Sequence, residues 1–298
     1  MRRVALQQTR SAPASGQSSA HGPAAGSFAL NRARESTAPA GRKRSGATTA
    51  FNAIPIPCQD ASASLPEAFA HVWETARGTD QAAVRAGLVE VDEWRPWWPQ
   101  AWALLRDDER ERVQRLRRPD DRDARVLAYA LHRLALAIEL RMPAADVPLY
   151  RDELGCPRLR GHAVHTSLSH CEGAVAWAIG RHGALGIDLE PASRSAWMDD
   201  IAARVCHPVE ARDLAALPGH QRGAALLALW VRKEAVLKAA GIGMAVEMEC
   251  FRSDTQWVDA RPALPACLHV RQLDTGPRWV AALAATDIWP LTAAWLRP

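Results

Sequence analysis

Hydrophobic residues recur every three to four positions over residues 120–140, which is the period of an amphipathic helix. One helix is predicted over residues 120–140 and a second over 221–240, where Gly241 ends it. Shorter helices are predicted over 104–118, 196–205 and 208–217. The helix over 120–140 therefore has one apolar face to bury.

Short apolar runs with alternating or β-branched residues predict strands before, between and after these helices. The first is residues 88–94, which the prolines Pro96 and Pro99 end. Three more follow one another closely, with Gly173 and Gly183 as turn residues between them. Those three are 164–168, 174–179 and 184–190, and the C-terminal strands are 268–272, 279–284 and 292–295.

The order of these elements is typical of an α+β fold. A weak internal echo points to two similar parts, because residues 172–179 and 277–284 are both turn-led apolar strands before another strand. The prediction is two similar α+β halves in a pseudo-twofold arrangement, each a small antiparallel sheet packed with a long helix. The N-terminal half would cover residues 64–183, and the C-terminal half 184–298.

Residues 1–60 are rich in Ser, Ala, Gly, Pro and Arg without periodicity, and we expect them to form a disordered tail. The first 50 residues carry eight basic residues and one acid, and the remainder carries 29 basic and 32 acidic residues. The net charge of +4 therefore reflects the tail. No specific nucleic-acid partner is expected, and binding of nucleic acid through the arginine-rich tail is the alternative.

Cysteine usage and hydropathy bear on the cellular compartment. Six cysteines without a Cys-x-x-Cys pair argue against a zinc ribbon, and the chain is too long for a disulfide-built miniprotein. No apolar run reaches the roughly 20 residues needed to span a bilayer, and the N-terminus lacks the apolar region of a secretion signal. We expect a cytoplasmic protein with reduced thiols and no membrane partner.

Lysine is rare in this chain, and its positions direct attention to residues 230–241. Only three of the 37 basic residues are lysine, and Lys233 and Lys238 both lie in this segment. Glu234 precedes Lys238 by four residues, which places the two side chains on one face of a helix. Since lysine offers a compact ammonium on a flexible stem, the segment is a candidate for binding phosphate.

A strand-like run over residues 186–190 carries two carboxylates, Asp188 and Glu190, on the same face. Two neighbouring carboxylates can share one hard cation, and magnesium prefers oxygen ligands. A half-buried strand with a solvated acidic face is the alternative explanation.

Together these segments form a specific pattern. Gly186-Ile-Asp-Leu-Glu190 is followed 40 residues later by Trp230-Val-Arg-Lys-Glu-Ala-Val-Leu-Lys238, and it is preceded by Ser169-His170 and by Gly155-Cys-Pro157. This pattern resembles the 4′-phosphopantetheinyl transferase superfamily, over roughly residues 85–298. The length is similar to that of the larger, surfactin-synthetase-associated type, which has two halves and is a monomer.

The resemblance implies roles around a metal ion. Asp188, Glu190 and Glu234 would ligate magnesium, which bridges the pyrophosphate of coenzyme A. Glu234 would also take the proton from the attacking serine hydroxyl, and Lys238 would hold the phosphates. Lys233 is the next candidate for a phosphate contact, with a solvent-facing position as the alternative.

The resemblance also implies a binding site for coenzyme A. Ser169 and His170 would contact its nucleotide end, with His170 near the 3′-phosphate. Further positive charge would come from a basic helical stretch, at Arg112, Arg115 and Arg125.

Some nearby positions depart from the family or have less direct roles. The family often has lysine where Cys156 stands, and Arg158 could substitute because a strand puts positions i and i+2 on one side. Glu210 is expected first to complement a helix N-terminus, and second to support the metal site or act as a base. His207 beside Cys206 offers too few ligands for a separate metal site.

The implied reaction moves the 4′-phosphopantetheine group from coenzyme A to a serine of an acyl or peptidyl carrier protein and releases 3′,5′-ADP. The carrier could serve fatty-acid, polyketide or nonribosomal-peptide synthesis, and the sequence does not distinguish among these. Because the nucleophile belongs to the partner, no Ser-His-Asp triad is expected. A catalytically weak carrier-protein-binding regulatory module of the same fold is the alternative.

Overall fold

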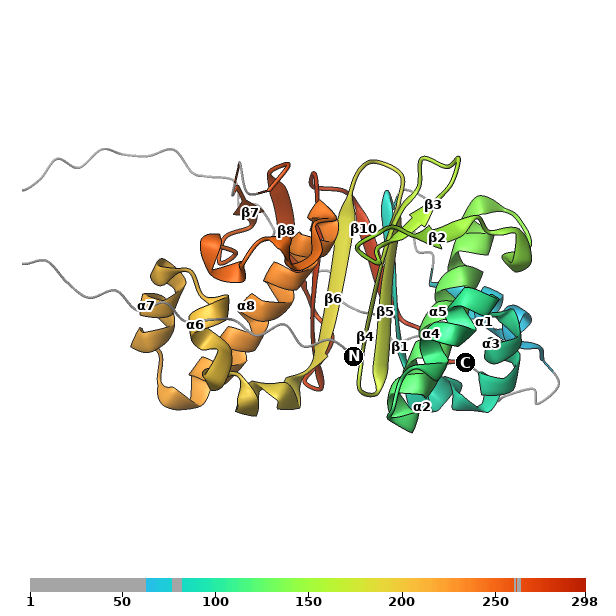
Figure 1. Cartoon of the computed structure of the whole chain (residues 1–298), viewed down its shortest axis with the longest axis horizontal. Helices are drawn as coiled ribbons and strands as arrows, with labels where there is room; N and C mark the ends of the chain where they lie inside the picture. Colours follow the sequence, from blue (N-terminus) through green and yellow to red (C-terminus); the bar gives the residue numbers. More distant parts are fainter. Residues whose placement is uncertain (1–62, 77–81, 260, 262–263) are drawn as a thin grey trace, which may run out of the picture. The chain divides into compact units, whose positions relative to one another are not determined.

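The computed structural model describes residues 63–76, 82–259, 261 and 264–298, and Figure 1 shows the arrangement of their helices and strands. The segment predicted to be disordered, residues 1–60, lies outside the described residues. The described chain mixes helices and strands, which agrees with the predicted α+β class. None of its described helices has both the length and the apolar character required to cross a bilayer.

The first part of the described chain is mostly helical. Its elements are α1 (Leu65–Thr75), β1 (Val84–Glu90), α2 (Val91–Trp94), α3 (Trp98–Leu104), α4 (Asp107–Gln114) and α5 (Pro119–Leu140). The strand predicted over 88–94 is wrong at its end, because residues 91–94 form a helical turn that buries Val91 and Trp94. Pro96 and Pro99 stand in first turns of helices, where a missing N–H is tolerated.

One four-stranded sheet has the order β10-β1-β5-β4. The strands that join β1 are β4 (His165–Cys171), β5 (Ala174–Gly180) and β10 (Leu291–Trp295). β1 is antiparallel to β5 but parallel to β10, so the prediction of a purely antiparallel sheet is wrong here. β10 thus lies in the same sheet as β1 although more than 200 residues separate them, and α5 packs against β4 and β5.

The second four-stranded sheet has the order β6-β9-β8-β7 and is antiparallel throughout. Its strands are β6 (Leu185–Pro191), β7 (Trp257–Val258), β8 (Leu268–Leu273) and β9 (Trp279–Ala285). The helix α8 (Gly219–Ala240) packs against β6 and β9. Gly241 ends it in a left-handed conformation, as predicted. In Figure 1 the labelled strands β6, β4, β5 and β1 lie between α8 and α5.

The connecting segments contain structure that the sequence pattern did not predict. A short hairpin pairs β2 (Leu149–Arg151) with β3 (Pro157–Leu159). The helix predicted over 196–205 is mostly 3₁₀ turns, and only α6 (Ala202–Val205) is α-helical. The next helix, α7 (Pro208–Ala216), agrees with the prediction.

The core has three parts, one between each long helix and its sheet and one between the two sheets. The layer between the sheets is built largely of small and aliphatic side chains, among them Ala86, Ala176, Ala178, Ile187, Ala281 and Leu283. The small alanine side chains suit a close approach of the two sheets, because they leave little volume to accommodate. β4 and β6 thereby come side by side in the middle of the molecule.

Candidate functional site

The candidate site is built where α8 lies on the edge strand β6. A Cβ atom at Gly186 would come within 2.1 Å of the Ala235 carbonyl oxygen and 2.4 Å of the Ala239 amide nitrogen. Glycine is therefore the residue that lets helix and strand approach this closely. The contact brings Glu234 and Lys238 of the helix to the acidic face of the strand.

Asp188 is deeply buried, with 4% of its surface exposed. Its Oδ1 accepts hydrogen bonds from Lys238 Nζ at 2.6 Å and from Ser169 Oγ at 2.8 Å. Ser169 Oγ in turn accepts from Lys238 Nζ at 3.0 Å and from the Leu189 amide at 3.3 Å. The other oxygen, Oδ2, is buried without a hydrogen-bond partner among the described residues. Such an oxygen is unusual in a folded protein, and a cation beside it would be favourable.

Two more carboxylates are electrostatically coupled to Asp188. Burial and the charge of Asp188 raise the pKa of Glu190, and the ion pair with Arg194 opposes this shift. Burial and the charge of Asp188 also raise the pKa of Glu234. Lys238 opposes this shift, and Glu190 adds to it. Because each charge disfavours ionisation of its neighbours, Asp188, Glu190 and Glu234 form one acidic cluster.

The acidic cluster offers oxygen ligands of the kind that magnesium takes, but it is not arranged as a finished metal site. Across the described ranges, no three or more His, Cys, Asp or Glu side chains stand in metal-binding geometry. Cationic side chains hold two of the acids instead, Lys238 on Asp188 and Arg194 on Glu190. The buried, unpartnered Oδ2 and the mutual repulsion of the carboxylates fit a hard cation at the acidic cluster. Magnesium ligation by these residues stays a prediction.

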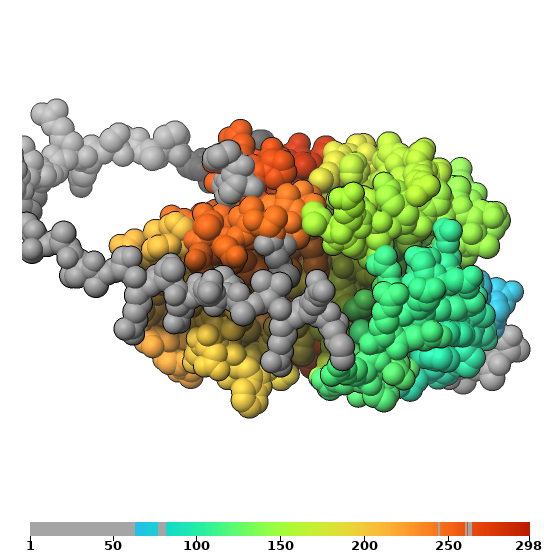
Figure 2. All heavy atoms as spheres, viewed as in Figure 1, coloured from blue at the N-terminus to red at the C-terminus, as the bar shows by residue number. Residues whose placement is uncertain are grey.

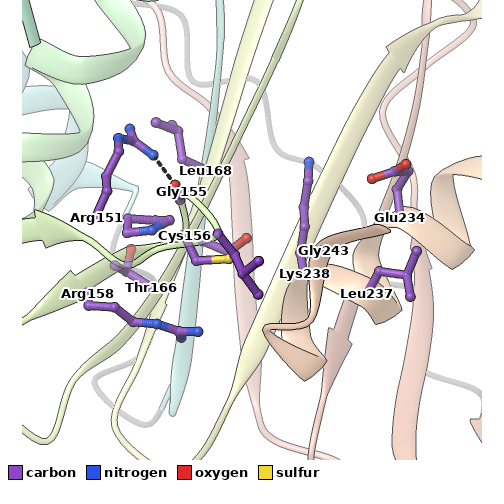
Figure 3. Close-up of a pocket in the computed structure, with 13 residues that line it drawn as sticks. Arg151, Gly155, Cys156, Arg158, Thr166, Leu168, Glu234, Leu237, Lys238 and Gly243 are labelled. Carbon is purple, nitrogen blue, oxygen red and sulfur yellow. Dashed lines mark hydrogen bonds between the residues drawn. The ribbon is translucent and has the colours of Figure 1, made fainter. Parts of the chain in front are cut away.

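A cavity of about 220 Å³ opens beside Glu234 and Lys238. Its other walls are the β2–β3 hairpin and β4, so it joins segments that are far apart in the sequence. Figure 3 shows Arg151, Cys156 and Arg158 across the cavity from Lys238. In Figure 2 the yellow-green atoms of the hairpin region abut the orange atoms at the end of α8.

Arg158 brings a positive charge to the wall on which Cys156 stands. Its Nε donates to Asp152 Oδ2 at 2.9 Å. Its guanidinium reaches the end of α8, where Nη2 lies 2.6 Å from the position of a Cβ on Gly241. The thiol of Cys156 lines the same cavity, and burial followed by the charge of Asp152 raises its pKa. A neutral thiol at this position therefore has a cationic neighbour two residues away.

Arg151 was missed by the sequence reasoning. Its Nη1 donates to the Gly155 carbonyl at 2.8 Å, and its guanidinium lies 4.7 Å from the ring centroid of Tyr129. Burial is the main cause that lowers the pKa of Arg151, and the charges of Arg112 and Arg125 lower it further. Arg151 lines the cavity, and Arg112 and Arg125 lie near enough to Arg151 to act on its charge. The only sequence signal was the proximity of Arg151 to the Gly155-Cys-Pro157 loop.

His170 lies in a second hollow of about 420 Å³, which Glu190 and Arg194 also line. Burial and the positive charge of Arg125 lower its pKa to about 4, and Lys238 contributes to the same shift. The imidazole is therefore neutral at pH 7, and it can donate a hydrogen bond to an anion without adding charge.

Two of the residues predicted to bind coenzyme A, Arg115 and Ser169, make their observed contacts elsewhere than in the cavity of about 220 Å³. The side chain of Arg115 is 76% exposed, and its ion pair is with Glu111 at 3.4 Å on the same helix. It lines neither hollow. The hydroxyl of Ser169 is buried and bonded to Asp188 and Lys238, so its observed contacts support the acidic cluster.

Lys233 neither faces solvent nor reaches the acidic cluster, which corrects both expectations for it. Its ammonium is fully buried and pairs with Glu210 at 2.6 Å. It also donates to three backbone carbonyls at 2.6–2.8 Å, those of Val205, Met248 and Phe251. Glu210 accepts from the His207 amide at 2.9 Å at the start of α7, so its predicted role at a helix N-terminus agrees with the structure.

Comparison with known proteins supports the resemblance seen in the motifs. Residues 184–284 match the model of the 4′-phosphopantetheinyl transferase superfamily. The chain is 27% identical over 154 residues to a "putative 4′-phosphopantetheinyl transferase" of a Synechocystis species. This match covers 51% of this chain and 63% of that protein. It is 28% identical over 181 residues to the 4′-phosphopantetheinyl transferase HetI of a Nostoc species. This match covers 59% of this chain and 72% of HetI. The first match thus covers less than two thirds of the relative's length.

Proposed function

We propose that this protein transfers the 4′-phosphopantetheine group from coenzyme A to a serine of a carrier protein and releases 3′,5′-ADP. The observation that carries the proposal is the acidic cluster beside Lys238, at the edge of a cavity whose opposite wall is basic. The match over residues 184–284 supports it, because this segment contains the acidic cluster and Lys238. The proposal includes a cytoplasmic monomer of the larger, surfactin-synthetase-associated type, with halves related by a pseudo-twofold axis.

Asp188, Glu190 and Glu234 are the residues that would hold a magnesium ion. When bound, the ion would neutralise negative charge on the pyrophosphate and on the departing 3′,5′-ADP. Ser169 and Lys238 fix the orientation of Asp188 through its Oδ1 and leave Oδ2 available. This arrangement supports Asp188 as the ligand that is best preorganised.

Coenzyme A would lie in the cavity between α8 and the β2–β3 hairpin. Phosphoryl transfer depends mainly on positioning and on neutralisation of charge, and the cavity offers cations on two walls. Lys238 stands on one wall, and Arg151 and Arg158 stand on the other. The partial burial of these arginines strengthens their attraction for phosphate, because solvent screens buried charges less. We propose that Arg158 supplies the positive charge that the family's lysine would have provided at the position of Cys156.

Glu234 is the residue that would accept the proton of the carrier's serine hydroxyl. The serine oxygen forms a bond to the β-phosphorus of coenzyme A, and the bond from that phosphorus to the 3′,5′-ADP oxygen breaks. A carboxylate with a raised pKa is a stronger base, and Glu234 has this property through burial and through Asp188. Lys238 would meet the negative charge that develops on the phosphates.

Intact-protein mass spectrometry tests the proposed function. The full chain is incubated with coenzyme A, magnesium and a carrier protein that lacks its prosthetic group, in parallel with fatty-acid, polyketide and nonribosomal-peptide carriers. We expect a mass gain of one phosphopantetheine group on at least one carrier type. If no carrier gains mass at any metal concentration, the transferase proposal fails, and binding of the same carriers would then favour the regulatory-module alternative.

A further inference from the structure

Arg194 is held at two points beside the acidic cluster. A 3₁₀ turn (Ala192–Trp197) begins directly after β6 and returns Arg194 to Glu190, with which it forms an ion pair through Nη1 and Oε1. The guanidinium carbon also lies 5.1 Å from the centroid of the Trp230 ring on α8. A guanidinium over an indole face is a favourable cation–π contact. Arg194 therefore lies between strand and helix and lines the second hollow.

The pair is unequally exposed. Glu190 retains 14% of its side-chain exposure, whereas Arg194 retains 39%. An arginine with that much access to water can leave the pair and be rehydrated, while the carboxylate stays at the site. The contact resembles a partly exposed ion pair, whose net contribution is modest.

The contact engages one of the two carboxylate oxygens that Glu190 could offer to a shared cation. In this structure Glu190 Oε1 is committed to Arg194, and Asp188 Oδ1 is committed to Lys238 and Ser169. A guanidinium and a divalent ion on the same carboxylate also repel each other. Binding of a metal at Glu190 and retention of the Arg194 pair are therefore opposed.

We propose that Arg194 is an internal counter-cation of Glu190 that competes with the divalent metal ion and so sets the metal affinity of the site. The inference rests on the proposed function for the assignment of Asp188, Glu190 and Glu234 as metal ligands. Arg194 then has a positioning role. It holds Glu190 in its present rotamer, the Trp230 ring holds the guanidinium in place, and a metal ion must displace Arg194 from Glu190.

Binding of manganese alone tests this role without any dependence on turnover. Titration calorimetry on the full chain, without coenzyme A, gives the dissociation constant of Mn²⁺ for the natural protein, Arg194→Gln and Arg194→Lys. We expect Arg194→Gln to bind Mn²⁺ about fivefold more tightly, as loss of one partly exposed competing ion pair implies. Arg194→Lys keeps the charge and should stay closer to the natural protein.

A matched control separates this competition from a general effect of net charge. Arg252 forms an ion pair with Asp254 at similar exposure, 44% and 28%, and lines neither hollow. Arg252→Gln removes the same charge and should leave the Mn²⁺ affinity unchanged. Asp188→Ala should abolish binding, which locates the ion, and thermal unfolding of each variant confirms that it is folded.

Three results would overturn the proposal. They are unchanged or weaker Mn²⁺ binding by Arg194→Gln, equal tightening by Arg252→Gln, and absence of Mn²⁺ binding in both the natural protein and Arg194→Gln. Failure of the proposed function has a different signature. In that case carriers gain no mass, while Arg194→Gln still binds Mn²⁺ more tightly than the natural protein.

Discussion

At the scale of single residues, the site is defined by three carboxylates, those of the acidic cluster, that the fold holds close together. Asp188 is fixed by Ser169 and Lys238, and its charge raises the pKa of both Glu190 and Glu234. Such crowding opposes folding, and proteins commonly retain it where function requires it. The acidic cluster should therefore reduce stability.

Replacement of Glu234 by glutamine tests this expectation. Burial and Asp188 raise the folded-state pKa of Glu234 above its ordinary value of 4.5, so the protonated form is favoured in the folded protein. The stability that protonated Glu234 contributes is then fully present below pH 4.5 and is lost as the pH rises through the folded-state pKa of Glu234. We expect Glu234→Gln to raise the unfolding temperature at pH 7 by about 2–4 °C, with the gain shrinking as the pH falls towards 4.5.

Calorimetric scans across pH measure the effect of this substitution. Glu111→Gln is the control, because Glu111 is 67% exposed and pairs only along the surface of α4. It should change the unfolding temperature little at any pH. A lower unfolding temperature for Glu234→Gln at pH 7 would contradict the account of a strained acidic cluster.

At the scale of elements, the site depends on the contact between α8 and β6. Gly186 permits this contact, and the pair of Lys233 with Glu210 ties α8 to the segments around α6 and α7. Residues 233 and 234 are adjacent in the chain but face different surroundings, because successive side chains of an α-helix point about 100° apart. Lys233 anchors the helix, and Glu234 faces the cavity.

Gly186→Ala should separate helix from strand. The added Cβ would clash with the backbone of Ala235 and Ala239, which cannot move as a flexible side chain does. We expect a loss of about 3 kcal/mol in the free energy of unfolding, together with loss of transfer activity. Gly219→Ala is the control, because a Cβ at Gly219 meets nothing within 4 Å. Urea unfolding that shows equal stability for both variants would refute the close-contact argument.

Lys233→Met should destabilise the protein through Glu210 and leave phosphate binding without a direct defect. Removal of one partner from a fully buried ion pair typically costs about 3–5 kcal/mol, because the other charge stays buried. The double variant with Glu210→Gln should recover part of that loss. Denaturant unfolding without coenzyme A measures both. A stable Lys233→Met protein that has lost only coenzyme A affinity would restore the phosphate-contact hypothesis.

The long helices could be predicted from the sequence because their apolar spacing and end signals are local. The 22-residue α5 begins at Pro119, and Gly241 follows the last residue of α8. Residues 192–205 could not be predicted well, because their turns depend on packing against α8. The hairpin of β2 and β3 was missed for another reason, since three-residue strands carry too little alternation to stand out.

At the scale of the whole molecule, distant segments complete each other. β10 pairs with β1 in the first sheet, the Leu296 amide donates to the Leu88 carbonyl at 2.8 Å, and Trp94 Nε1 donates to the Leu296 carbonyl at 3.0 Å. The parallel pairing of β10 was not predictable from local patterns, because it joins residues about 200 positions apart. The same holds for Arg151 and Arg194, whose places beside the site follow from tertiary packing.

Deletion of residues 290–298 should therefore unfold the part of the molecule that is built on the first sheet. It removes the strand that covers the edge of β1 and the carbonyl that binds the buried Trp94. We expect loss of cooperative thermal unfolding and of the near-ultraviolet signal of the buried tryptophans. If the shortened chain unfolds cooperatively at the temperature of the natural protein, β10 is not required for the fold.

The central claim is that the acidic cluster serves phosphopantetheine transfer. The most direct measurement compares the natural protein with Asp188→Ala, by the mass of a carrier protein after incubation with coenzyme A and saturating magnesium. Removal of Asp188 relieves the repulsion that raises the pKa of Glu190 and Glu234, so it should leave the far-ultraviolet signal intact. The account predicts a carrier heavier by one phosphopantetheine group with the natural protein, and a rate at least about 100-fold lower with Asp188→Ala, in keeping with loss of a transition-state charge contact. A folded Asp188→Ala protein that modifies the carrier at a similar rate would contradict it.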